Sequence, residues 1–342
     1  MFKELTKPFI IAEMSGNHNQ SLERALMLVE EAAKTGVDAL KIQTYTPDTI
    51  TIDSDREEFL IKDKDSLWKG ETLYSLYKKA YTPWDWDKPI FDKCAKLGII
   101  GFSTPFDFSA VDFLEDLNVP FYKIASFENY DLPLLKYVAK TKKSVIMSTG
   151  MIQLNELKES VVVLKDNGCP EVVILKCTST YPADPENTNL LTISDMQKQF
   201  PDCVIGLSDH TLGTAVSVAS IALGAKVIEK HFTVSRAEGG VDSAFSMEPD
   251  EMKNLVADAN IAYQSLGKVF YGPTEAEIPS LKYRRSLYAV KDIKKGERFT
   301  PENIRSIRPA IGLSTKMYDK IIGKKAAIDI SRGTPLNKNL IK

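Results

Sequence analysis

The sequence predicts a (β/α)8 barrel followed by a small C-terminal domain. Between about residues 9 and 270, eight short apolar segments alternate with stretches whose apolar residues recur at helical spacing. Each short segment is apolar on both faces, which is typical of parallel strands covered by helices. Eight such strand–helix units occupy roughly 250 residues, the usual size of this barrel. After residue 270 the alternation ends and a series of small elements follows.

The expected strands are short, and helical patterns separate them along the chain. The first helical pattern, LERALMLVEEAAKTG, ends at Gly36, and glycine commonly ends a helix because it adopts a left-handed conformation without strain. A doubly wound open sheet is the competing architecture, but no Gly-rich phosphate loop follows the first strand. The strands are expected at residues 9–15, 39–45, 99–104, 121–126, 145–149, 172–178, 204–209 and 227–233.

One long polar segment, residues 46–82, separates the second strand from its helix. It carries a run of charges at 55–65 and several aromatic residues, among them Trp68. Long loops that follow barrel strands often act as lids or interfaces. A plain surface excursion with a short helix of its own explains the pattern equally well, so both interpretations stay open.

The C-terminal part of the chain predicts a separate small domain. The barrel is expected over residues 1–270, a linker over 271–284 and the small domain over 285–342. Within this domain DIKKGERFTPENI, from Asp292, and DISRGTPLNKNLI, from Asp329, form a weak repeat that suggests two turns related by a pseudo-two-fold axis. A domain this small is marginally stable alone, so we expect it to pack on another surface.

Composition excludes several classes of protein. The 44 basic and 46 acidic residues nearly cancel, so no basic surplus points to nucleic acid or to an anionic membrane. No stretch approaches the roughly 20 apolar residues of a membrane helix. The 4 cysteines show no paired metal spacing and are typical of buried thiols in a reducing compartment. These features predict a soluble cytoplasmic protein.

Polar residues gather at the expected C-terminal ends of the strands, where functional side chains of barrel enzymes lie. Such groups are costly on apolar strands unless they are paired or line a site. A structural ion pair explains any one of them, but it does not explain all eight strand ends. The residues are Glu13, Lys41, Gln43, Thr104, Lys123, Ser126, Glu128, Ser148, Thr149, Lys176, Thr178, Ser208, Asp209, His210, Glu229, Lys230 and His231.

Of the 3 histidines, His210 follows the seventh expected strand and His231 lies near the end of the eighth. Neighbouring strand ends lie within reach of one divalent ion, and neutral imidazole suits a first-row metal. A pair of hydrogen-bonded core histidines is the alternative. Glu13 and Asp242 can complete or support the metal shell. His18 fits either a loop-fixing role or a substrate contact.

The lysines and small hydroxyl residues suggest an anionic substrate. Lys41 and Lys123 can neutralise a phosphate and a carboxylate, while hydroxyl groups donate hydrogen bonds to their oxygens. Lys123 has two other interpretations: a salt bridge to Glu128, or the Schiff-base lysine of an aldolase. The hydroxyl donors expected here are Thr104, Ser126, Ser148 and Ser208.

Eight motifs, in order, resemble those of the sialic acid synthase family. They are IAEMSGNHNQ, ALKIQTY, FSTPFD, KIASFENYDLPLL, STGM, CTSTYP, GLSDHT and EKHFT. The tail from about residue 285 resembles the antifreeze-like (SAF) domain of that family. The resemblance covers nearly the whole chain and implies a (β/α)8 barrel in a homodimer whose small domain is swapped onto the partner barrel. It also implies condensation of phosphoenolpyruvate with an amino-sugar aldehyde.

Two segments resemble the branch of this family that makes pseudaminic acid. Residues 239–249 read GGVDSAFSMEP, with Ser243, Ala244 and Phe245 where sialic and legionaminic acid synthases commonly carry His, Lys and Ala. Residues 68–84, WKGETLYSLYKKAYTPW, are similar to that branch as well. The implied acceptor is 2,4-diacetamido-2,4,6-trideoxy-altrose, whose methyl group would suit Ala244 and Phe245. N-acetylneuraminate and legionaminate synthases are the alternatives within the family.

The resemblance implies roles for particular residues of this sequence. The phosphoenolpyruvate set is Lys41, Thr104, Lys123, Ser126, Ser148, Ser179 and Ser208. The set that contacts the sugar or positions water is Glu13, Gln43, Glu128, Tyr181 and Asp242. His210 and His231 would bind a divalent metal, manganese first and magnesium or cobalt otherwise. Arg308 of the partner chain would reach the N-acetyl group of the acceptor. The catalytic set is Glu13, Lys123, Glu128 and Asp242, with Glu13 or Glu128 as general base.

Two functions of other classes compete with this one. A Schiff-base aldolase would act through Lys123 or Lys41 and would need no metal. Alternatively, the tail is a carbohydrate-binding module on an inert barrel, which the strand-end residues and both histidines argue against.

Overall fold

The computed structural model describes residues 1–62 and 68–342, so part of the charged run at 55–65 lies outside the described residues. The chain divides into two compact units, Met1–Gly267 and Lys268–Lys342. Each unit has its own hydrophobic core. In the described part of the chain, no helix is both long and apolar enough to cross a membrane.

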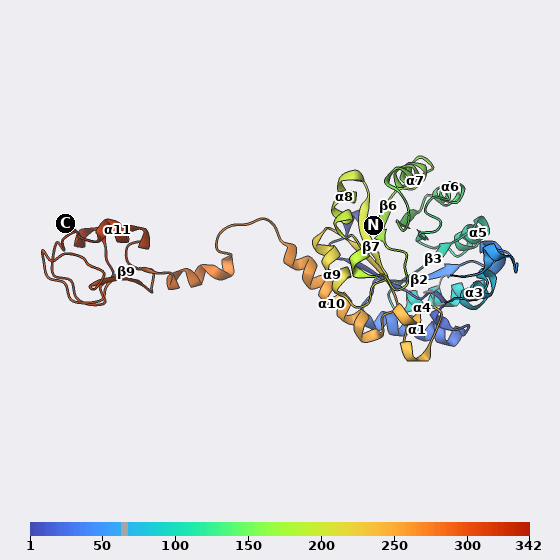
Figure 1. Cartoon of the computed structure of the whole chain (residues 1–342), viewed down its shortest axis with the longest axis horizontal. Helices are drawn as coiled ribbons and strands as arrows, with labels where there is room; N and C mark the ends of the chain where they lie inside the picture. The colour runs from blue at the N-terminus through green and yellow to red at the C-terminus, as the bar shows by residue number, and fades with distance from the viewer. Residues whose placement is uncertain (63–67) are drawn as a thin grey trace. The chain divides into compact units, whose positions relative to one another are not determined.

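The first unit is a closed barrel in which eight parallel strands pair in chain order, with β8 against β1 (Figure 1). This confirms the predicted (β/α)8 fold, and the doubly wound open sheet is wrong. The strands are β1 Phe9–Glu13, β2 Ala39–Thr44, β3 Ile100–Pro105, β4 Phe121–Ile124, β5 Ser144–Ser148, β6 Val172–Cys177, β7 Val204–Asp209 and β8 Val227–His231.

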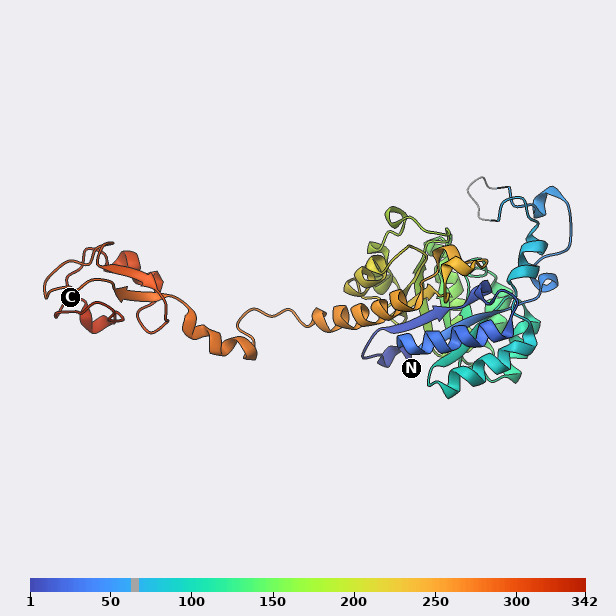
Figure 2. The ribbon, with the colours of Figure 1, turned by 90° about the horizontal axis from the view of Figure 1, so that it is seen from below.

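Helices pack around the outside of the barrel (Figure 2). The side chain of Ser21 caps the first helix by accepting from the Arg24 amide, and Gly36 ends it with φ 87°. Its buried residues follow helical spacing and face the strands. The barrel helices are α1 Leu22–Thr35, α4 Asp87–Lys96, α5 Phe108–Asp116, α6 Leu132–Ala139, α7 Leu154–Asp166, α8 Leu191–Gln199, α9 Ala215–Ala222 and α10 Pro249–Leu266.

Strand alternation divides the core into an outer and an inner layer. One set of strand residues, such as Ile10 and Leu40, packs with the helices, while Phe9, Ile11 and Ala39 belong to a second cluster formed by the alternate residues. Phe2 packs edge-on against Phe9 with ring centroids 5.4 Å apart and closes the amino-terminal end of the barrel. The opposite end of the interior is left to polar side chains.

The segment after β2 contains two short helices, α2 Pro47–Ile50 and α3 Leu73–Ala80. Its Trp68 indole N–H donates to the carbonyl of Val241, in the loop after β8, across 3.2 Å. The segment therefore has helical structure of its own and also touches a loop at the carboxyl-terminal end of the barrel.

The second unit has a two-stranded antiparallel sheet, β9 Ser286–Ala289 with β10 Ile304–Ile307, and a short helix, α11 Tyr318–Ile321. Its two repeated segments cap each other: Asp292 accepts from the amide of Arg332 at 2.7 Å. Asp329 accepts from the amide of Lys295 at 2.8 Å. These reciprocal bonds match the pseudo-two-fold relation predicted from the repeat. A 3-10 helix, Glu275–Tyr283, lies within the predicted linker.

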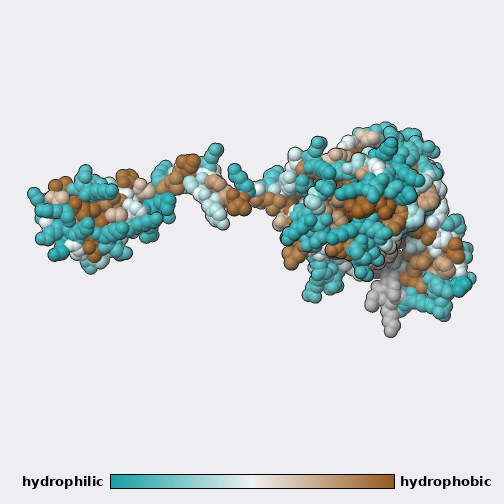
Figure 3. Space-filling view, turned by 90° about the horizontal axis from the view of Figure 1, so that it is seen from above, coloured by the Kyte–Doolittle hydropathy of each residue, from teal (hydrophilic) through white to brown (hydrophobic). Residues whose placement is uncertain are grey.

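The surfaces of both units are largely polar on the face that Figure 3 presents, with apolar patches between the polar residues. Two large apolar side chains just after the barrel unit are almost fully exposed: Val269 is 91% and Tyr271 94% exposed. A covering surface for these side chains is expected.

Candidate active site

The candidate site follows from the alternation of side chains along the strands. In β1, Phe9 and Ile11 point into the barrel, and the next inward position is Glu13. The same step of two residues leads from Ala39 to Lys41 and from Phe121 to Lys123. Most strand interiors are therefore apolar at their start and polar at their carboxyl-terminal end, whereas β6 ends its inward row at Cys177. The inward polar positions are Glu13, Lys41, Gln43, Thr104, Lys123, Ser148, Ser208, Glu229 and His231.

Two buried ion pairs form the floor of the site. Lys41 Nζ lies 2.6 Å from Glu13 Oε2, and Lys123 Nζ lies 2.7 Å from Glu229 Oε1. Lys41 also lies 3.7 Å from the same oxygen of Glu229, which joins the two pairs into one cluster. Burial raises the pKa of Glu13. Burial acts the same way on Glu229, but Lys123 and Lys41 outweigh it and hold that pKa below its usual value.

The salt bridge from Lys123 to Glu128, the structural alternative drawn from the sequence, is wrong because Lys123 pairs with Glu229 instead. Burial lowers the pKa of the Lys123 amine. Glu229 is one of the strand-end residues but not part of the expected site set, and the structure adds it to the site. The signal that finds it is the inward parity of β8, two residues after Val227 and two before His231.

Hydroxyl groups surround the lysines. Lys41 donates to Thr104 Oγ1 at 3.2 Å, and Ser208 donates to Glu229 at 3.4 Å. The buried Ser148 hydroxyl has no hydrogen-bond partner among the described residues. Two ammonium groups and an unused hydroxyl at the end of a barrel suit an anionic ligand.

Gly150 brings Ser126 and Ser179 together. Its amide donates to Ser126 Oγ at 3.1 Å. A Cβ at this position would lie 2.0 Å from Ser179 Oγ and 2.6 Å from Ser126 Oγ, so only glycine leaves room for both hydroxyls. Both predicted phosphoenolpyruvate serines of this region thus lie in one place.

The predicted histidine pair is brought together by β7 and β8, with ring centroids 5.4 Å apart. His210 Nδ1 lies 2.9 Å from the carbonyl oxygen of Thr178; a carbonyl only accepts, so this nitrogen carries a proton. In the neutral ring Nε2 is then the nitrogen that can bind a metal. Burial lowers the pKa of His231 well below its usual value, which keeps that ring neutral. Its buried Nδ1 has no hydrogen-bond partner in the described chain.

These features fit a divalent first-row ion on two imidazoles. Asp242 Oδ2 lies 3.9 Å from His231 Nδ1, which is beyond hydrogen-bond distance. Among the described residues, no three His, Cys, Asp or Glu side chains form a metal-binding group. The remaining ligands would therefore be water or substrate.

Aromatic rings line the site beside the histidines. The ring of Tyr181 lies 4.5 Å from that of His210 and 5.3 Å from that of Phe245, between centroids. Phe245 in turn lies 5.0 Å from His231. Trp68 extends the row outward, 6.4 Å from Tyr181. The sequence singled out Tyr181 and Phe245 separately, and the fold makes them neighbours.

Of the other predicted site residues, Gln43 and Glu128 lie in the barrel unit, whereas Arg308 lies in the second unit. Gln43 donates to Glu13 at 3.0 Å and orients that carboxylate. Glu128 has one buried carboxylate oxygen with no hydrogen-bond partner among the described residues, and burial raises its pKa to about 7. Arg308 is exposed and belongs to the second unit.

His18 is completely buried in the loop after β1. Its Nε2 lies 3.2 Å from Thr82 Oγ1, and its Nδ1 accepts from the Gln20 amide at 3.2 Å. Both ring nitrogens are thus used within the protein, which favours the loop-fixing role over a substrate contact.

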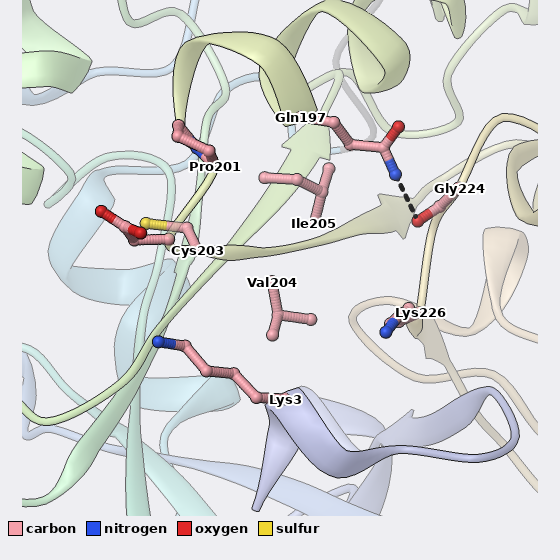
Figure 4. Close-up of a pocket in the computed structure, with 9 residues that line it drawn as sticks. Lys3, Gln197, Pro201, Cys203, Val204, Ile205, Gly224 and Lys226 are labelled. Carbon is pink, nitrogen blue, oxygen red and sulfur yellow. Dashed lines mark hydrogen bonds between the residues drawn. The ribbon is translucent and has the colours of Figure 1, made fainter.

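A separate hollow of about 380 Å³ lies at the amino-terminal end of the strands. Figure 4 shows Lys3 and Lys226 at its edge and Gln197 donating to the carbonyl of Gly224. Val204, the first residue of β7, lines it. This hollow is therefore at the opposite end of the barrel from the buried ion pairs.

Comparisons with known proteins show which family the chain belongs to. The chain matches the NeuB family over residues 28–271 and the SAF domain over residues 284–342. It is 45% identical to a pseudaminic acid synthase of Campylobacter jejuni, over 97% of this chain and 96% of that protein. It is 38% identical to the pseudaminic acid synthase of Helicobacter pylori, over 99% of each.

More distant relatives include N,N'-diacetyllegionaminic acid synthase of Campylobacter jejuni, at 36% identity over 94% of this chain and 96% of that protein. Among solved structures, the N-acetylneuraminic acid synthetase of Leptospira borgpetersenii is similar, with a TM-score of 0.72 and 30% identity. That likeness covers 82% of this chain and 92% of the Leptospira chain.

Proposed function

The chain belongs to the NeuB family, and from this we propose that it condenses phosphoenolpyruvate with 2,4-diacetamido-2,4,6-trideoxy-altrose and water to give pseudaminic acid and phosphate. The family membership confirms the resemblance predicted from the sequence. The observation that carries the choice of product is the 38% to 45% identity to pseudaminic acid synthases over nearly the full chain. Legionaminic and N-acetylneuraminic acid synthesis are the alternatives, supported by relatives of lower identity.

The buried lysines would hold phosphoenolpyruvate. Lys41 and Lys123 lie together and supply the positive charge that its phosphate and carboxylate need. Hydroxyl groups of neighbouring strand ends would donate the remaining hydrogen bonds, and Glu13 and Glu229 would hold the ammonium groups in place. The hydroxyl donors are Thr104, Ser126, Ser148, Ser179 and Ser208.

The histidine pair would hold a divalent ion, manganese first, with magnesium or cobalt as alternatives. When bound, such an ion supplies Lewis acidity toward the acceptor's aldehyde oxygen. The ring of Tyr181 is a direct neighbour of His210, and the ring of Phe245 is a direct neighbour of His231. The acceptor would therefore enter along these two aromatic rings. Asp242 and Gln43 would orient the acceptor and its water.

The reaction forms one carbon–carbon bond and one carbon–oxygen bond to water, and it breaks the carbon–oxygen bond to phosphate. C3 of phosphoenolpyruvate attacks the aldehyde carbon, and the aldehyde oxygen gains a proton to become a hydroxyl. The resulting C2 cation adds water, which loses a proton to a carboxylate, and the tetrahedral intermediate then expels phosphate by C2–O cleavage. The buried lysines hold the departing phosphate as an anion, and Glu128 is the carboxylate we assign to the water.

The small domain would complete the site in a homodimer. Arg308 is exposed on the second unit, and the partner chain's copy of that domain would bring it to the acceptor's N-acetyl group. We place the reaction in the cytoplasm, where phosphoenolpyruvate is made, and its product in flagellin glycosylation or a surface polysaccharide.

The deciding measurement is phosphate release from phosphoenolpyruvate with two acceptors, each with and without EDTA. We expect release with 2,4-diacetamido-2,4,6-trideoxy-altrose, little with N-acetylmannosamine, and loss of activity on chelation that manganese restores. Preference for N-acetylmannosamine would move the chain to the N-acetylneuraminate branch. Turnover that EDTA leaves unchanged would remove the metal from the histidine pair.

The assignment of Glu128 predicts a pH dependence. Burial is the main cause of its raised pKa, about 7, and Asp131 adds to it. A base acts unprotonated, so kcat/KM should rise with pH through about 7. Because the folded-state pKa exceeds the usual 4.5, the proton favours the folded state, and stability should fall as pH rises between those two values.

Glu128→Gln tests both expectations in one variant. It should lack the rising limb of the kcat/KM profile and should lose the corresponding slope of unfolding free energy against pH. A rising limb that survives unchanged in Glu128→Gln would assign the proton transfer to another group.

A further inference from the structure

A second hollow of about 590 Å³ lies beside the candidate active site, between the segment after β2 and the loop after β8. Trp68 and Ala244 come from these two segments, and Leu76 and Val241 complete the apolar part of the wall. Asn19 and Gln20, in the loop after β1, form a polar part. Lys78 and Lys79 of helix α3 and Glu71 before it add charged groups. The hollow thus lies among helix α3 and three loops at the carboxyl-terminal end of the barrel.

Aromatic contacts connect this hollow to the histidine pair. Tyr181 lies between them, with its ring centroid 6.4 Å from that of Trp68 and 4.5 Å from that of His210. From the other side, Ala244 precedes Phe245, whose ring lies 5.0 Å from His231. A ligand with its reactive end at the histidines would therefore extend past Tyr181 into the hollow.

The wall of the hollow has a chemistry that suits apolar substituents and amide groups. An indole ring and three aliphatic side chains offer contact to methyl groups. Gln20 donates its amide nitrogen to the carbonyls of Lys79 and Tyr81, and Asn19 donates to Gly239. What these two side chains offer a ligand is therefore a carbonyl oxygen, which accepts from an acetamide N–H.

We infer that this hollow is the subsite for the outer end of the acceptor, and that Trp68 and Ala244 select a sugar with a C6 methyl and a C4 acetamido group. The inference rests on the proposed function. N-acetylmannosamine carries hydroxyl groups at both positions, and the indole face of Trp68 and the methyl group of Ala244 give a C6 hydroxyl no hydrogen bond in exchange for lost water.

Ala244→Lys and Trp68→Ala test the subsite. Ala244 is exposed, so a lysine there is compatible with folding and would place a charge in the hollow. Each change should raise the KM for the diacetamido sugar about tenfold or more, while the KM for phosphoenolpyruvate stays within twofold of the unaltered protein. Trp68→Phe keeps an aromatic face and should recover most of the affinity.

Ala237→Lys is the matched control, because Ala237 is exposed in the same loop and does not line the hollow. Its acceptor KM should equal that of the unaltered protein. Turnover of the diacetamido sugar by the unaltered protein, with unchanged acceptor KM in Ala244→Lys and Trp68→Ala, would overturn this inference alone. No turnover of that sugar by the unaltered protein would overturn the proposed function and the subsite with it.

Discussion

Replacing Lys123 with methionine should lower kcat/KM for phosphoenolpyruvate about a thousandfold, comparable to the loss of a preorganised donor at a developing charge. Lys123 is buried and lies 2.7 Å from Glu229, so water cannot replace the missing ammonium group at that depth. The substrate's negative charge would then face the carboxylate of Glu229 with only Lys41 to offset it. Initial rates at varied phosphoenolpyruvate concentration measure the effect.

The same change should also destabilise the barrel, and the two effects can be separated. Removing one partner of a buried ion pair costs about 3–5 kcal/mol because the other charge is left uncompensated. Glu229→Gln in the Lys123→Met background removes that charge, so the double variant should regain much of the unfolding free energy without regaining activity. Urea denaturation beside the rate measurement distinguishes the two.

Recovery of activity in the double variant would contradict the proposed role. It would mean that Lys123 serves only to compensate Glu229, and that another group binds the substrate. Lys88→Met gives a control, because Lys88 is an exposed lysine of the barrel unit whose partner Asp92 lies one helical turn away. That variant should match the unaltered protein in both measurements.

The parity of the strands explains why the sequence predicts so much of this site. A step of two residues from a core position to a polar one, as from Phe121 to Lys123, requires the polar group to lie inside the barrel. The eight strand ends then meet at one place, since parallel strands share a direction. The histidine pair follows from the same argument, because its members come from neighbouring strands.

The partners within the site do not follow from the sequence. The sequence offers both Glu128 and Glu229 as partners of Lys123, and the closed barrel brings Glu229 of β8 to it from across the interior. Asp209 and Lys230 occupy outward positions on the same strands and pair with each other at 2.8 Å. A prediction from strand-end position alone therefore assigns too many residues to the site, because it includes side chains that face the helices.

Loop contacts are the other feature beyond the reach of a single sequence. Trp68 lies in the segment after β2, yet it donates to Val241 in the loop after β8. Neither segment carries a periodic pattern that would pair them. Which loops touch is decided by the closed barrel, because it brings the ends of all strands to one rim. Single side-chain contacts such as this one then form between loops that are distant in the sequence.

His210→Gln should reduce kcat about a thousandfold and remove the response of the enzyme to added manganese, since one of the two imidazoles would be lost. Glutamine preserves a hydrogen bond toward the carbonyl of Thr178, which His210 now donates to at 2.9 Å. Loss of activity in a folded variant therefore reports on the ring's second nitrogen. Manganese binding, followed by calorimetry, gives a readout that does not depend on turnover.

His18→Gln is the matched control, because His18 is equally buried but uses both ring nitrogens within the protein. It should lower the unfolding free energy by about 1–3 kcal/mol, the cost of a disturbed buried hydrogen bond, and leave manganese affinity unchanged. Equal loss of manganese binding in both variants would assign the metal to a different set of residues. Retained binding in His18→Gln and lost binding in His210→Gln would leave the pair at the ends of β7 and β8 as the ligands, since burial alone is common to all three histidines.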